Sequence, residues 1–204
     1  MVSRAEIEED LKNKGDFVQI DHLNRYLKQA DSIDVKKFIL IKLAEIYIAK
    51  GFYLDAAKRL NLAADASITF KEKYDVYMKE AELLVKCNEF EMADQAIKKA
   101  LSQTDNKDKN QCYDKYISFY ETEALSNEKS QKNRKAIDFY EKIHPMARTR
   151  DKRELIRTKI ISLYGKLGMV KDQNRWNNRV EPKYELPTKT IEPGSFEDLG
   201  LGRI

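Results

Sequence analysis

The stretch LAEIYIAKGFYLDAAKRLNLAA, from Leu43 to Ala64, decides the fold that we expect. Leu40, Leu43 and Tyr47 follow one another at intervals of three and four residues, which is the spacing of one face of a helix. Gly51 then supplies a residue that tolerates positive φ, and a second apolar stripe with helical spacing begins after it. The stretch therefore predicts a helix, a tight turn and a second helix.

The same pattern returns in EAELLVKCNEFEMADQAIKKAL, from Glu80 to Leu101. With Ala44 placed on Ala81, six further positions match: Tyr47 on Leu84, Gly51 on Asn88, Tyr53 on Phe90, Ala56 on Ala93, Leu60 on Ile97 and Ala63 on Ala100. The alanines allow two helix backbones to approach closely. A single pair of this kind cannot cover its own apolar face, so we expect it to stack on a neighbour.

This slot-by-slot pattern resembles the tetratricopeptide-repeat (TPR) family. The two copies are offset by 37 residues, which is longer than the ~34 residues of that family. No proline closes either copy, and the irregular spacing is also similar to the attachment-protein (SNAP-like) branch of such repeats. The resemblance implies an all-α fold, a right-handed α-solenoid of about four to five antiparallel helical hairpins.

Outside the two copies we expect less regular hairpins. Ser3 and Glu6 have the spacing of a capping box, and Gly15 is aligned with Gly51 in a first hairpin. The polar run from Ser126 to Asn133 predicts an inserted inner loop in a later hairpin. A further helix is expected to begin at Thr149 or Asp151, with Asp151 and Glu154 at capping-box spacing, and the last helix is predicted at 169–180.

The domain organisation that we expect is one TPR-like helical-repeat domain, residues 1–180, and an extended Pro/Gly-containing tail, residues 181–204. The tail holds three of the four prolines of the chain and seven large apolar side chains. We expect it either to pack on its own solenoid or to act as a short linear motif for a partner.

Composition favours a cytoplasmic helical protein. No apolar run approaches the ~20 residues of a membrane span, and the first residues lack the apolar core of a secretory signal. Cys87 and Cys112 are far apart and predict reduced thiols. Neither His22 nor His144 has metal-ligand spacing to another residue, and no phosphate-binding loop is present. We therefore predict a non-enzymatic protein with no catalytic, cofactor-binding or metal-binding residues.

Charge is distributed unevenly along the chain. Residues 129–179 hold 15 Lys and Arg but only 5 Asp and Glu, whereas residues 1–128 hold 20 and 24. The densest part, which we call the basic block, contains Arg148, Arg150, Lys152, Arg153, Arg157 and Lys159. It is a candidate surface for an anionic partner. The alternative is that its side chains pair with carboxylates of this chain, either in the acidic repeats or at Glu192, Glu197 and Asp198 of the tail.

The family resemblance also implies a concave face formed by the first helix of each hairpin. The slots carried over to this chain are Ile41, Lys42, Glu45, Ile48, Met78, Lys79, Glu82 and Val85. Their charges form matched rows, which ion pairs within each helix explain equally well.

Three functions follow from these observations. The first is a protein-binding scaffold that holds a peptide or helix on its concave face, with the basic C-terminal third favouring an acidic partner. The second is association with RNA or a ribonucleoprotein through residues 129–179. The third is self-association through the tail or through an end of the solenoid.

Overall fold

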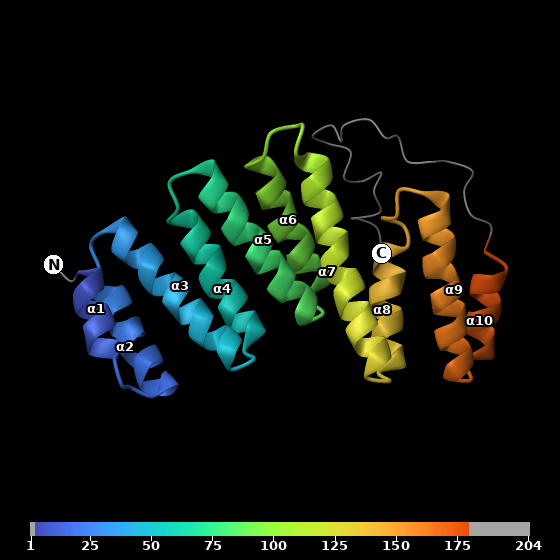
Figure 1. Ribbon diagram of the computed structural model, residues 1–204, viewed down its shortest axis with the longest axis horizontal. Helices are drawn as coiled ribbons and strands as arrows, with labels where there is room; N and C mark the ends of the chain where they lie inside the picture. The colour runs from blue at the N-terminus through green and yellow to red at the C-terminus, as the bar shows by residue number, and fades with distance from the viewer. Residues whose placement is uncertain (1–2, 180–204) are drawn as a thin grey trace. The chain divides into compact units, whose positions relative to one another are not determined.

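Helices account for all regular secondary structure in residues 3–179, the part of the chain that the computed structural model describes (Figure 1). The prediction of an all-α fold is therefore confirmed. The chain divides into two compact units at Asp105, a boundary inside the stretch for which we expected one domain. The predicted tail lies outside the described residues.

Unit 1 comprises six helices: α1 (Arg4–Leu11), α2 (Asp16–Gln29), α3 (Ile33–Ala49), α4 (Tyr53–Asp65), α5 (Phe70–Lys86) and α6 (Phe90–Ser102). Each of these helices packs against the next one along the chain, and α3 to α6 have the most extensive contacts. Consecutive helices run in opposite directions (Figure 1). The helices of the unit therefore pack in the order of the sequence, and α5 packs against both α4 and α6.

Unit 2 contains four described helices: α7 (Lys109–Lys129), α8 (Asn133–Ile143), α9 (Arg150–Lys166) and α10 (Val170–Asn177). Three tyrosines of α7, at positions 113, 116 and 120, are fully buried. The hydroxyl groups of Tyr116 and Tyr120 lie 2.8 Å apart, and their rings meet edge to face. Aromatic packing therefore forms much of the core of this unit.

Small side chains lie at the helix contacts, as the sequence predicts. Ala44, Ala56, Ala81 and Ala93 each expose 1% of their surface or less. Leu43 and Leu84 are fully buried beside them. The alanines allow the helices to approach, and the larger residues fill the space that remains.

The turns that follow α3, α5 and α9 share one backbone conformation. Gly51 and Asn88 have φ values of 77° and 63°, as predicted, and Gly168 has 68°. After each turn a backbone N–H reaches back to a carbonyl oxygen five residues earlier; that of Phe52 donates to Tyr47 at 2.8 Å. This is the Schellman arrangement, which satisfies the carbonyl groups at the end of a helix.

Two predictions about the turns are wrong. Gly15 has a φ of −67° and is the N-cap of α2, whereas Asn13 takes the left-handed conformation with a φ of 60°. The inner loop predicted at 126–133 is largely helical, because α7 continues to Lys129 and only a short turn around Gln131 remains. Gln131 has a φ of 58°, so a residue with no special preference for this region occupies the turn.

The predicted start of the first helix is confirmed, and of the two starts predicted for the later helix the one at Thr149 is confirmed. Ser3 and Glu6 form the predicted capping box. Thr149 caps α9 by accepting a hydrogen bond from the backbone N–H of Lys152, so Asp151 lies inside the first turn and not at the cap. The final described helix is also shorter than predicted and ends at Asn177.

Two further sequence expectations can be compared with the helices. None of the described helices is long and apolar enough to cross a membrane. Cys87 and Cys112 are both free thiols, and Cys112 is buried.

The shared turn conformation predicts opposite effects of two substitutions. Gly51→Ala should lower the free energy of unfolding by about 1 kcal/mol, because alanine is strained at positive φ while open space surrounds the position. Gln131→Gly should raise it by up to about 1 kcal/mol by removing the same strain. Urea unfolding followed by circular dichroism measures both, and equal signs for the two variants would contradict the assignment.

Candidate functional site

The side chains predicted to line the concave face lie on α3 and α5. Lys42 pairs with Glu45 and Lys79 pairs with Glu82, in both cases at 3.2 Å within one helix. Ion pairs at this spacing account for the matched rows of charge without a ligand. Ile41 and Ile48 are half-buried.

Two of the predicted face residues are not accessible. Met78 exposes 2% of its surface and Val85 exposes none. Both are therefore corrected to core residues, because α5 packs on α4 and on α6 and most of its surface is covered.

The basic block is mostly engaged within unit 2. Arg148 lies 3.6 Å from the carboxylate of Asp114, Lys152 lies 2.8 Å from that of Glu121, and Lys159 lies 3.0 Å from that of Glu128. Arg157 pairs with Glu154 and donates to the carbonyl oxygens of Trp176 and Asn177. Arg153 is buried, and Arg150 is exposed.

These contacts favour the alternative that the sequence left open. Four of the six cations neutralise carboxylates of their own unit, so the block is not a continuous positive surface. The acidic tail residues that were also candidate partners lie outside the described part of the chain.

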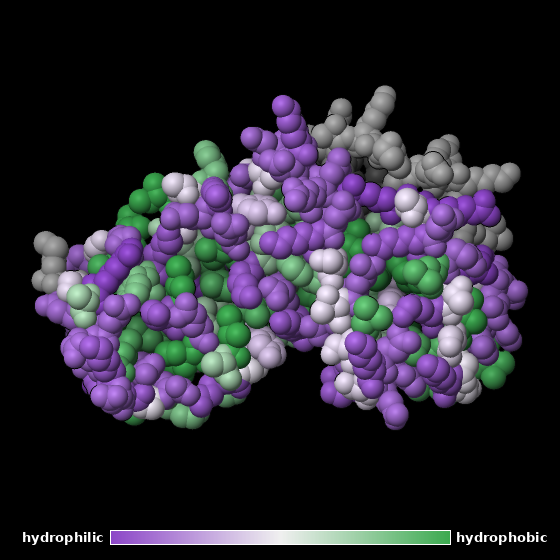
Figure 2. All heavy atoms as spheres, in the orientation of Figure 1, coloured by the Kyte–Doolittle hydropathy of each residue, from purple (hydrophilic) through white to green (hydrophobic). Residues whose placement is uncertain are grey.

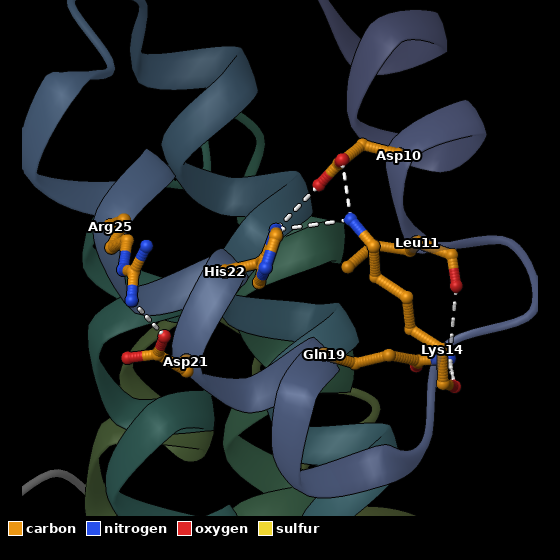
Figure 3. A network of polar contacts seen from close by, with 7 residues as sticks. All are labelled: Asp10, Leu11, Lys14, Gln19, Asp21, His22 and Arg25. Atoms are coloured by element: carbon orange, nitrogen blue, oxygen red, sulfur yellow. Dashed lines mark hydrogen bonds and ion pairs between the residues drawn. The ribbon is translucent and has the colours of Figure 1, made fainter.

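A polar network that was not predicted joins α1 to α2 (Figure 3). The carboxylate of Asp10 lies 2.7 Å from Nδ1 of His22 and also pairs with the ammonium group of Lys14. The side-chain amide of Gln19 donates to the carbonyl oxygens of Leu11 and Lys14, at 3.2 and 2.8 Å. The network therefore links α1, α2 and the turn between them.

The geometry of this network is that of a structural clamp. All its donors and acceptors come from two adjacent helices and their turn (Figure 3). The ammonium group of Lys14, followed by the contact with His22, lowers the pKa of Asp10 to about 2. The carboxylate is therefore ionised at neutral pH, where it contacts His22 of α2 and Lys14 of the turn.

The clamp predicts a pH-dependent contribution to the stability of the first helix pair. Because the pKa of Asp10 is lower in the folded chain than in the unfolded chain, its contribution is present above pH 4 and is lost as the pH falls towards 2. Asp10→Asn should therefore increase amide hydrogen exchange in α1 at pH 6. Asp21→Asn, which removes an exposed pair with Arg25 on α2, is the control. Equal exchange in the two variants would contradict the clamp.

A groove in unit 1 combines apolar and polar side chains in one hollow. It has a volume of about 390 Å³ and is lined by residues of α4 and α6, with one residue of α5, Glu80. Leu62 of α4 and Met92 of α6 line it and expose 48% and 38% of their surface. Hydrophobic residues also lie among hydrophilic ones elsewhere on the surface (Figure 2). The groove is formed by the second helix of each repeat copy, not by the predicted face.

Glu80 is the buried polar group of this groove. It exposes 5% of its surface, and both its oxygens accept hydrogen bonds from Nδ2 of Asn61, at 2.9 and 3.1 Å. Burial raises the pKa of Glu80 to about 7, although Asn61 and Lys99 act in the opposite direction. A carboxylate that is neither exposed nor paired with a cation at contact distance is unusual, because an ionised group is costly to bury.

The sequence contains one signal that points to Glu80. In the alignment of the two copies, Glu80 falls on Leu43, which is fully buried. A carboxylate in a slot that is apolar in a sister repeat marks either an exposed position or a buried polar site. The burial of Glu80 shows that this position is a buried polar site, and that burial follows from the packing of α4 and α6 on α5.

Comparisons with protein-family models, with curated proteins and with solved structures found no match to this chain. The resemblance to tetratricopeptide repeats therefore stays a prediction. Within the described residues, no group of three His, Cys, Asp or Glu side chains is placed to hold a metal ion.

The raised pKa of Glu80 predicts how stability changes with pH. The folded chain binds this proton more tightly than the unfolded chain, in which the pKa is near the usual 4.5. The contribution of Glu80 to the free energy of unfolding therefore falls as the pH rises from about 4.5 through 7. Glu80→Gln should become more stable than the wild type by up to about 3 kcal/mol above pH 8.

Urea unfolding of both proteins at pH 5 and pH 8 measures this difference. Glu82→Gln is the matched control for loss of a carboxylate from α5. A constant difference between Glu80→Gln and the wild type at the two pH values would show that Glu80 is not buried as an anion.

Proposed function

We propose that the protein is a non-enzymatic protein-binding module of TPR type, in which helical hairpins stack as a right-handed solenoid. The groove between α4 and α6 then holds a peptide or a helix of a partner. The observation that carries the proposal is the combination of exposed Leu62 and Met92 with buried Glu80 in one hollow. Binding sites combine an apolar lining with a few well-placed polar groups in this way.

The dimensions of the groove support a short segment as the ligand. A volume of about 390 Å³ accommodates one or two side chains and not a folded domain. α5 packs against both α4 and α6, and residues of α4 and α6 line the groove, so a segment lying in it would contact both helices. Helix-in-groove recognition uses apolar anchors in this manner.

We do not extend the proposal to RNA or to steering of an acidic partner by the basic block. The carboxylates of Asp114, Glu121, Glu128 and Glu154 already neutralise four of its six cations. Nucleic-acid binding depends on cations that are free to replace the counterions of phosphates.

Selection of peptides tests the function directly. The immobilised full chain would be used to select binders from a random peptide library, and each binder would be measured against two variants. Leu62→Asp places a charge on the groove, and Leu155→Asp makes the same change at an exposed residue of α9. We expect binders that lose at least about tenfold in affinity with Leu62→Asp and are unaffected by Leu155→Asp. Binders that do not distinguish the two variants would contradict the proposal.

A further inference from the structure

Glu80 offers more hydrogen-bonding capacity than its surroundings use. A carboxylate accepts at about four lone-pair positions. The hydrogen bonds that the described residues donate to Glu80 come from Asn61. Glu80 also lines the groove, beside Asn61, and exposes 5% of its surface. The site therefore has acceptor capacity that the described residues leave unused.

From this arrangement we infer that Glu80 receives a positively charged side chain, arginine or lysine, from the partner segment in the groove. The inference rests on the protein-binding function proposed above and names the chemistry that the groove recognises. A cation supplies both the charge and the hydrogen-bond donors that a desolvated carboxylate lacks.

The walls of the groove suit the rest of such a side chain. Arginine and lysine have long aliphatic stems that pack on apolar surface while the charged end reaches a polar group. Leu62 and Met92 provide that surface, and Ala57 and Ala96, both buried, leave room between the helices. The stem would lie along the walls, and the charged end would reach Glu80.

Charged side chains at the edges of the groove favour particular residues next to the cation in the partner segment. Lys58 on α4 and Lys99 on α6 line the groove and are exposed to solvent. Exposed charges are screened by salt, so they oppose a buried cation only weakly. They favour acidic residues on either side of it. The segment that fits is therefore one basic residue with carboxylates a helical turn away.

Charge also makes the recognition sensitive to pH. The groups around Glu80 are Lys58, Asn61 and Asp65 on α4, Tyr77 on α5 and Lys99 on α6. Because the pKa of Glu80 lies at about 7, its ionised fraction rises about tenfold between pH 6 and pH 8. A partner cation binds the ionised form, so affinity should rise by up to about tenfold over this range.

Peptides selected on the groove provide the probes for the test. Among binders that are sensitive to Leu62→Asp, we expect one recurring Arg or Lys with acidic neighbours. Replacing that residue by Met in the peptide should weaken binding to the wild type about tenfold or more, and should have little effect on binding to Glu80→Gln. Glu82→Gln, which removes a partly exposed carboxylate from the same helix, should behave as the wild type.

Measurements on the wild type alone keep the test independent of how the variant folds. With an Arg-containing peptide, affinity should rise from pH 6 to pH 8, whereas the Arg→Met peptide should show no rise. Binders without a recurring basic residue, or an Arg→Met change with no effect, would overturn the inference while leaving the protein-binding function intact. A failure to obtain any groove-dependent binder would overturn both.

Discussion

The packing of the helices depends on small side chains at the contacts between them. Ala44, Ala56, Ala81 and Ala93 let the backbones of α3 to α6 approach closely. Larger residues there would separate the helices and open the core. The close approach also sets the depth of the groove, because Ala57 and Ala96 leave space above α5 that bulkier side chains would fill.

At position 80, folding favours an apolar side chain, whereas the proposed recognition of a cation favours a carboxylate. The aligned residue in the first copy, Leu43, is an ordinary core side chain and contributes by burial alone. Glu80 takes the same slot with a group that is costly to desolvate and that one amide only partly satisfies. Replacement of buried ionic groups by apolar ones commonly stabilises proteins. A carboxylate at this position is therefore costly to folding, and the proposed binding of a cation would account for it.

The sequence predicted the helices and their contact residues well because both follow from local spacing. The apolar stripe of Leu40, Leu43 and Tyr47 and the turn at Gly51 depend on residues a few positions apart. The groove, the clamp at Asp10 and the pairing of Lys159 with Glu128 depend on side chains from different helices. The two ion pairs join residues that are 12 and 31 positions apart in the sequence. No local pattern connects residues so far apart. The sequence of the basic block suggested a surface for an anionic partner because three of the four carboxylates that pair with it lie on α7, far away in sequence.

The turn at Gln131 also bears on how this chain could be related to others. Successive left-handed residues at Gly51, Asn88, Gln131 and Gly168 are 37, 43 and 37 positions apart. The longer interval is absorbed by α7 and by the connection before it, and the turn itself is unchanged. A search of the sequence for a repeat of constant length therefore no longer aligns the turns after Asn88. An alignment anchored on the left-handed residue, whatever its side chain, keeps these four turns in phase, which a constant repeat length cannot do.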